Sequence, residues 1–368
     1  MGSLVYNGPY VLYSGNAGTV QYTLDEGESL QCSLNSGQYF PIKAIADGEP
    51  HNIDFAEILN ALPLSVTGLP NDASSIEYAG TNLVTVRIIS DSSSTVASIL
   101  HHVIKGFYKD KTCSALSVID ALQSKPLTVA PQIRRTFPNS REYISYLNRQ
   151  SPGNPPQVRI DYIIYKRGGE QVSGSFSAQS TSRIHTFRAD YKAMISRQSL
   201  GRNFEIEGWD ITVSITYNTS GGGETVTLPT IRYKLHNGQV KTSNFAFIND
   251  LGGVDSIHAL GGFKTMGNYE PTAFLNSGET LPLTVNPATQ YEASSGPIST
   301  EEERNLWLAF LRAEKKYYIT DDGAPELIHL LEASPELNKG EISEISFKFA
   351  RGYERGGELA TFKALPSF

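Results

Sequence analysis

The chain has 368 residues, of which 39% are hydrophobic and 19% charged, and its formal net charge is -7 at pH 7. This length exceeds what one hydrophobic core usually covers, so we expect three domains. The acidic balance argues against nucleic acid as the main partner, because nucleic acid is bound by a concentrated basic face. A content of 32 Gly, 19 Pro and 19 Tyr is typical of short strands joined by many turns.

The first third of the chain is predicted to consist mainly of strands. Residues 4–24 alternate between apolar and polar side chains, which is the pattern of half-buried strands. The β-branched run at 83–89 predicts a central strand, and residues 99–108 predict the next one. Asp54 and Glu57 have the spacing that caps the start of a helix, so one short helix is expected between the strands.

Two segments further along carry helical or mixed patterns. Residues 112–123 fit either a short helix or a loop. Within 139–147, Tyr143, Ile144 and Leu147 recur at helical spacing, in a stretch that is otherwise rich in Pro, Arg and Asn. This spacing favours a helical turn at 139–147.

A linker is predicted at 151–156, because its consecutive prolines fit neither a helix interior nor a central strand. We place a domain boundary there. The expected organisation is an N-terminal β-rich domain over 1–150, a central β-sandwich domain over 151–258, and a C-terminal β-rich domain with one helix over 259–368.

The central part has the clearest hairpin pattern. Alternation over 158–164 leads into a Gly-Gly turn at 168–169, and a second alternating strand is predicted at 209–217. A third, at 231–235, leads into Asn-Gly at 237–238, which is a strong signal for a tight turn. Turns at such intervals are typical of a β-sandwich.

The C-terminal third is predicted to enclose one helix between strands. A Thr-x-x-Glu capping box begins at Thr300, and the apolar stripe that follows predicts a helix over 301–313. Strand structure resumes at 317–319, turns at 321–323, and ends in a last strand at 342–349. The predicted fold class is therefore mainly β, with tandem β-sandwich-like domains and a few short helices.

The motifs that accompany common catalytic and metal sites are missing from the sequence. It contains no phosphate-binding loop, no G-x-G-x-x-G, no H-E-x-x-H, no C-x-x-C and no G-x-S-x-G. Adjacent strand residues point to opposite faces, so His101 and His102 are poorly placed to chelate one ion. Cys32 and Cys113 match no zinc or redox spacing, and two isolated thiols favour a reducing compartment. We expect no enzyme activity, no cofactor and no metal.

A glycosidase is the remaining enzymatic hypothesis, because two acids far apart in sequence can converge on one cleft. The sequence does not select a pair, and capping or solvated acids are the simpler interpretation. The conceivable acids are Asp161, Asp210, Asp255, Glu270 and Glu326.

Four residues are candidate interface or ligand contacts. Tyr317 and Tyr318 are adjacent tyrosines, a residue type that protein interfaces enrich. Asn249 and Asp255 belong to a polar turn between two predicted strands. The alternative interpretation is structural, because such side chains satisfy nearby backbone amides.

The segments Asp54–Leu59, Phe247–Ser256 and Leu306–Leu311 give the chain a resemblance to uncharacterised virion-associated proteins of tailed phages and prophages of Bacteroidota. The resemblance implies a structural part of the tail, the baseplate or a related appendage. It brings no catalytic residue to this sequence.

The expected function is therefore a non-enzymatic structural component of a phage virion that acts by protein–protein assembly. Its expected partners are other virion proteins and copies of itself. The alternative is a glycan-binding or receptor-binding module of a phage appendage or cell surface, with host surface polysaccharide as the ligand. Residues 1–21 lack a signal-peptide pattern, and no stretch approaches 18 apolar residues. We expect synthesis in the host bacterial cytoplasm, no membrane insertion, and a final location in the virion.

Overall fold

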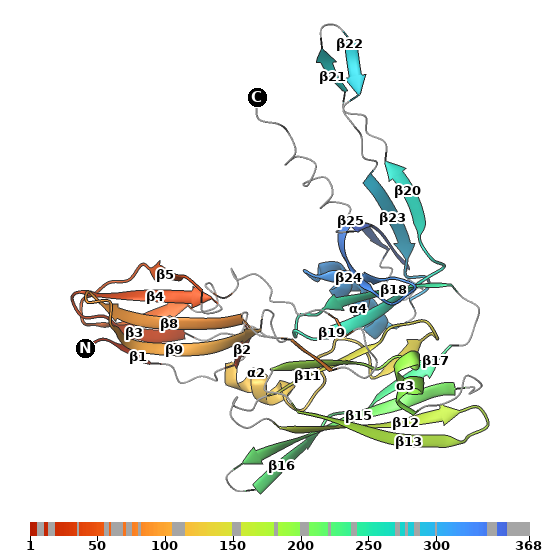
Figure 1. Ribbon diagram of the computed structural model, residues 1–368, viewed down its shortest axis with the longest axis horizontal. Coiled ribbons are helices and arrows are strands. Elements are labelled where there is room, and N and C mark those ends of the chain that lie inside the picture. The colour runs from red at the N-terminus through yellow and green to blue at the C-terminus, as the bar shows by residue number, and fades with distance from the viewer. Residues whose placement is uncertain are drawn as a thin grey trace.

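A computed structural model describes the greater part of the chain and shows a mainly β protein with several antiparallel sheets and short helices, as the sequence predicts (Figure 1). In the part of the chain that the structure describes, no helix is long and apolar enough to cross a membrane. The described residues are 1–5, 11–13, 19–34, 37–54, 59, 69–70, 76–79, 82–104, 115–148, 156–179, 183–198, 206–219, 222–236, 241–268, 273–276, 279–282, 288–298, 300–336 and 344–351.

The N-terminal domain is formed by two sheets around one core. One sheet has the order β1-β3-β6 and the other β2-β9-β8-β4-β5. Alternate side chains of β3, β4 and β8, such as Val20, Leu30 and Val86, are buried between them. The strands are β1 Ser3–Val5, β2 Val11–Tyr13, β3 Thr19–Thr23, β4 Glu28–Leu34, β5 Tyr39–Ile42, β6 Pro50–Asp54, β8 Asn82–Ser90 and β9 Thr95–Ile104.

These elements confirm the strand predicted at 83–89 and most of the next one, which begins earlier, at Thr95. Asp54, the expected helix cap, is the last residue of β6. The rest of that predicted helix lies outside the described residues, apart from Leu59.

The central sheet has the order β10-β17-β15-β12-β13, and β16 pairs with β15. A smaller middle sheet has the order β11-β14-β7. The helix α2 resolves the open prediction at 112–123. The elements are β7 Ile76–Ala79, α2 Ala115–Leu122, β10 Ile133–Thr136, β11 Tyr143–Leu147, β12 Gln157–Lys166, β13 Gln171–Gln179, β14 Ile184–Arg188, α3 Tyr191–Gln198, β15 Ile206–Thr219, β16 Gly222–Thr227 and β17 Ile231–Leu235.

The C-terminal sheet has the order β19-β18-β24-β25-β26-β23-β20. The helix α4 packs on it through Trp307 and Phe310, which meet Phe245 and Phe347. Thr300 caps α4 by accepting a hydrogen bond from the Glu303 amide, as predicted. The elements are β18 Thr242–Ile248, β19 Val254–Leu260, β20 Lys264–Asn268, β21 Ala273–Asn276, β22 Glu279–Pro282, β23 Ala288–Ser294, α4 Glu301–Arg312, β24 Lys316–Ile319, β25 Pro325–Glu336 and β26 Glu344–Arg351.

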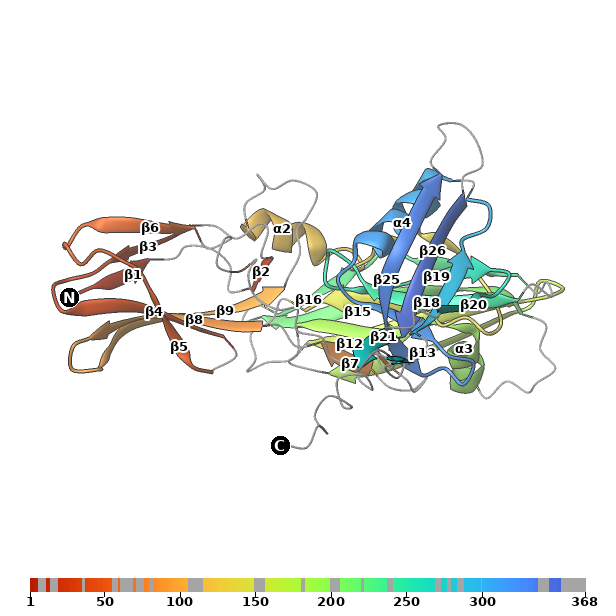
Figure 2. The same cartoon turned by 90° about the horizontal axis from the view of Figure 1, so that it is seen from above.

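The middle sheet packs between the central and the C-terminal sheets, and α4 covers the other face of the C-terminal sheet, beside β25 and β26 (Figure 2). On one face of the middle sheet, Tyr146 and Phe187 join the core of the central sheet, which includes Trp209. On its other face, Tyr143 joins a cluster with Ala246 of the C-terminal sheet. The middle sheet is thus buried on both faces.

This double burial corrects the expectation of a helical turn at 139–147. The five residues of β11, Tyr143–Leu147, are all buried, and they pair with β14 as a strand. A strand that is covered on both faces loses the alternation that marks a half-buried one. Its apolar residues then match a helical spacing by coincidence.

The expected boundaries at 150 and 258 do not separate the sheets. β10 and β11 precede residue 150, yet they pair with β17 and β14 of the central and middle sheets. β18 and most of β19 precede residue 258, yet β18 pairs with β24 of the C-terminal sheet. The Pro-rich residues 151–155 and the Asn-Gly pair at 237–238 lie outside the described residues. The sheet to which each of these strands belongs is decided by partner strands that are distant in sequence. Composition does not reveal these partners.

Candidate functional site

The outer face of the central sheet is largely polar, and it lies opposite the core. Three pairs of hydroxyl groups are hydrogen-bonded along it: Ser214 with Thr227 at 3.2 Å and Thr216 with Thr225 at 3.0 Å between β15 and β16, and Thr212 with Thr230, which precedes β17, at 2.8 Å. Ile163 on the same face is 38% exposed. An antiparallel sheet that packs on one side commonly presents such a solvated face on the other.

A hydrogen-bonded cluster of Tyr165, Asp210 and Arg232 lies at one end of this face. Arg232 binds the Asp210 carboxylate through two parallel bonds, Nε to Oδ1 at 2.7 Å and Nη2 to Oδ2 at 2.6 Å. The Tyr165 hydroxyl donates to Asp210 Oδ2 at 2.7 Å, and the Arg232 guanidinium lies 5.6 Å from the Tyr165 ring centroid. Such bidentate pairs fix the orientation of both side chains.

The protonation states of this cluster follow from its bonds. Partial burial acts to raise the pKa of Asp210, but the hydrogen bonds from Arg232 and Tyr165 and the charge of Arg232 outweigh it, so the pKa is lowered. The hydrogen bond to Asp210 raises the pKa of Tyr165 and also that of Arg232. The cluster is therefore a fixed carboxylate and guanidinium pair near neutral pH.

Beside the cluster lies a groove of about 700 Å³ whose lining includes Gly208. Gly208 stands between Tyr165 of β12 and Lys234 of β17 in the sheet register. A Cβ atom at Gly208 would lie 2.3 Å from the Tyr233 carbonyl oxygen, so glycine is required there. The groove is lined by Tyr165, Arg167, Ile206, Glu207, Gly208, Arg232, Tyr233, Lys234, Leu235 and His236.

Positive charge gathers in the lining of this groove and on the neighbouring strand β10. Arg135 and Lys234 are exposed and directly paired in the parallel β10–β17 ladder, where like charges repel. Neither forms an ion pair in the described part of the chain. Burial, and then the charges of Arg135 and Lys234, lower the pKa of His236. Lys234 of the groove lining therefore has no carboxylate partner among the described residues, and Arg135 lies directly opposite it on β10.

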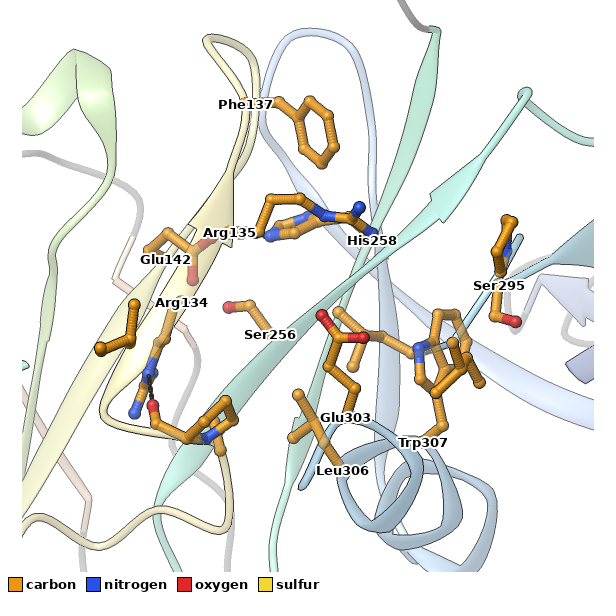
Figure 3. Close-up of a pocket in the computed structure, with 16 residues that line it drawn as sticks. Arg134, Arg135, Phe137, Glu142, Ser256, His258, Ser295, Glu303, Leu306 and Trp307 are labelled. Carbon is orange, nitrogen blue, oxygen red and sulfur yellow. Dashed lines mark hydrogen bonds and ion pairs between the residues drawn. The ribbon is translucent and has the colours of Figure 1, made fainter. Parts of the chain in front are cut away.

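A second, smaller cavity of about 70 Å³ lies between β10, β19 and α4 (Figure 3). His258 Nε2 lies 2.7 Å from Glu142 Oε1, and its Nδ1 lies 3.0 Å from Asn244 Oδ1. Ser256 Oγ is buried without a hydrogen-bond partner among the described residues. Because both nitrogens of His258 are engaged, this histidine is not available as a base for Ser256. The cavity has room for a few water molecules and is part of the contact between two sheets.

Asn249 and Asp255, two of the candidate contacts, hold segments of the chain together. Asp255 is fully buried and accepts hydrogen bonds from the Val129 amide at 2.9 Å, from Asn249 Nδ2 at 2.7 Å and from the Thr128 hydroxyl. Asn249 also donates to the Leu127 carbonyl at 3.0 Å. The structure therefore favours the structural interpretation, and it places Asp255 on β19 rather than in the predicted turn.

The other two candidate contacts lie on β24 with different surroundings. Tyr318 is 6% exposed and packs in the aromatic core, with its ring centroid 5.6 Å from Phe245 and 5.3 Å from Phe263. Tyr317 is half-buried and packs against the cluster that contains Tyr143. The two tyrosines do not form one surface.

The acids considered for glycoside hydrolysis are engaged individually. Asp161 pairs with Arg159 and Asp210 with Arg232, and Glu326 lies 3.4 Å from Arg351. Asp255 is buried in the network described above, and Glu270 lies outside the described residues. Among the described residues, no group of three His, Cys, Asp or Glu side chains is placed to hold a metal ion.

The sequence alone does not indicate the groove. The alternation of apolar and basic residues in β17 shows that Arg232 and Lys234 share a face. It does not show that Tyr165 and Gly208 lie beside them, because these belong to strands that join β17 only through the sheet order.

No protein-family model matches the chain, and no curated protein matches it. Among solved structures, it is similar to a marsupial T cell receptor, with 7% identity, a TM-score of 0.19, and coverage of 95% of this chain and 92% of the other. It is also similar to the full extracellular region of plexin A4, with 8% identity and a TM-score of 0.19, over 95% of this chain and 36% of the other. A TM-score of 0.19 does not establish a shared fold or a shared function. The fold itself defines a mainly β protein with sandwich-like packing of sheets.

Proposed function

We propose that the chain is a non-enzymatic structural component of a phage virion, of the tail, baseplate or appendage type, and that it acts by protein–protein assembly. Its final location is then the particle, and its partners are other virion proteins and copies of itself. The observation that carries the assembly part is a hairpin that stands away from the layered sheets. The particle itself is proposed from the resemblance of the sequence.

The hairpin of β21 and β22 lies beyond the ends of β20 and β23, away from the main body (Figure 1). Phe274 and Leu281 are direct partners in it. An isolated two-stranded hairpin is marginally stable in water, so packing against a partner is the usual source of its stability. A hairpin that projects in this way is suited to contact a neighbouring subunit through its backbone and its position.

Removal of the projecting hairpin is expected to abolish assembly and leave the fold intact. Asn268 and Ala288 are paired at the ends of β20 and β23, so residues 269–287 can be replaced by a two-residue Asn-Gly turn. The mass measured by size-exclusion chromatography with light scattering should fall from an oligomer to a monomer. The circular dichroism spectrum should remain that of the parent chain.

The control variant places the same Asn-Gly turn at 168–169, in the β12–β13 hairpin, and should assemble like the parent. An unchanged oligomer after removal of 269–287 contradicts the role of the hairpin. Mass spectrometry of purified phage particles tests the location. A monomeric parent chain that is absent from every particle contradicts the whole proposal.

The second candidate function is a glycan-binding module, whose ligand would be host surface polysaccharide. The groove over Gly208 supports it, because the groove combines an aromatic ring, a fixed carboxylate and guanidinium pair, and open access from the surface. A volume of about 700 Å³ lies within the usual range of small-ligand sites. Both functions are compatible with one appendage protein.

A further inference from the structure

We propose that the groove over Gly208 is a binding site for an acidic saccharide, with its carboxylate held by Lys234 and Arg232. This assignment rests on the second candidate function and specifies its ligand class. Gly208 is the only position of its row without a side chain, between Lys234 on one strand and Tyr165 on the other. Gly208, Lys234 and Tyr165 all line the groove, so a ligand in it lies beside both the lysine and the tyrosine.

The anionic part of the ligand follows from the cations. Arg135 and Lys234 lie opposite each other without a carboxylate partner in the described part of the chain. Arg232 uses Nε and Nη2 for Asp210, so its Nη1 is left for another acceptor. Its side chain is 50% exposed beside the groove. A bound carboxylate would relieve the repulsion between Arg135 and Lys234 and accept hydrogen bonds from Lys234 and Arg232.

The saccharide part follows from the acceptors in the same groove. Glu207 is exposed, lines the groove, and forms no ion pair among the described residues. It is displaced by an irregularity in the β12–β15 pairing, where Ile206 and Gly208 rather than Glu207 face β12. A carboxylate there repels a ligand that is anionic throughout, such as polyphosphate. It accepts hydrogen bonds from hydroxyl groups, which an acidic sugar provides together with its carboxylate.

The test measures binding of the full chain to short oligomers of galacturonic acid, glucuronic acid and sialic acid by isothermal titration calorimetry. At least one oligomer should bind, and its carboxyl-reduced, neutral counterpart should bind about tenfold more weakly or not at all. Poly-glutamate and inorganic phosphate serve as anions without sugar hydroxyls. Equal binding of the reduced oligomer, or equal binding of poly-glutamate, overturns the assignment.

Two variants connect the binding to the groove. Lys234→Gln should lower the affinity for the acidic oligomer by about tenfold, because it removes one charge-assisted contact. Arg159→Gln is the matched control, since Arg159 is a cation on the same sheet that pairs with Asp161 away from the groove. The affinity of Arg159→Gln for the acidic oligomer should equal that of the parent chain.

Equal losses in both variants, or no binding of any of the three acidic oligomers by the folded parent, overturn the proposal. These outcomes are distinct from those for assembly. A chain that forms oligomers and binds no acidic sugar retains the assembly function and loses the groove assignment. A chain that is monomeric and binds the acidic sugar loses the assembly function and retains the groove assignment.

Discussion

The variant Asp255→Ala is expected to lower the free energy of unfolding by about 3–5 kcal/mol, because it removes one partner from a buried charged network. The Asp255 side chain is fully buried, and Arg134, whose Nη1 lies 4.0 Å from it, is only 6% exposed. Without the carboxylate, the Val129 amide and the Asn249 amide group each lose an acceptor. Buried donors that lose their partners carry the full cost of desolvation.

This loss should extend over two sheets rather than one strand. Asp255 lies on β19 of the C-terminal sheet, while Arg134 lies on β10 of the central sheet and Val129 precedes that strand. Urea denaturation followed by circular dichroism and by tryptophan fluorescence measures the change, since Trp209 and Trp307 lie in different cores. Both signals should shift to lower urea concentration.

The matched control for this variant is Asp161→Ala. Asp161 pairs with Arg159 on the exposed face of the central sheet, where the two side chains are 41% and 66% exposed. Exposed ion pairs contribute little, so the change should stay within about 0.5 kcal/mol. If Asp255→Ala costs no more than this control, the network does not stabilise the contact between the sheets.

Stability is also expected to fall as the pH is lowered from about 6.5 to about 4, because of His101. Its side chain is fully buried in β9, and burial, followed by the charge of His102, lowers its pKa to about 4. Below pH 6.5 the unfolded chain binds a proton at this residue and the native chain does not, so acid favours unfolding. The lowered pKa corresponds to a loss of about 3 kcal/mol, complete near pH 4.

The variant His101→Gln should remove most of this acid sensitivity, and His329→Gln, at an exposed position of β25, should retain it. Some sensitivity should remain in both, because burial and the charge of Arg183 lower the pKa of His102 as well. The measurement is the free energy of unfolding in urea at intervals between pH 7 and pH 4. Parallel curves for His101→Gln and the parent would contradict the assignment.

The local elements were predictable where their signals are local. The capping box at Thr300 and the stripe through Trp307 and Phe310 are confirmed as α4, because a helix is specified by contacts within a few residues. The alternation at 158–164 is confirmed as β12, one face of which is buried. The apolar stripe and the alternation depend only on which side of the helix or strand faces a core, so both can be recognised from neighbouring residues.

The candidate site was less predictable, because it depends on strand order. The sequence presents Asn249 and Asp255 as polar residues of a turn, whereas both side chains are buried in the fold. The groove needs Gly208 beside Lys234 and Tyr165, three residues on three strands. A sequence gives the face of each residue along its own strand, but the neighbouring strands are chosen by packing across the whole fold.

The sequence by itself determined the β class, the position of α4 and the strands that alternate, since these follow from periodicity, turn residues and caps. Only the tertiary structure decided that β11 is a strand buried on both faces, that β10 joins the central sheet, and that β18 joins the C-terminal one. These outcomes depend on pairings between residues about 40 to 100 positions apart, which leave no signal in the local sequence because they are selected by hydrogen bonds and burial across the whole fold.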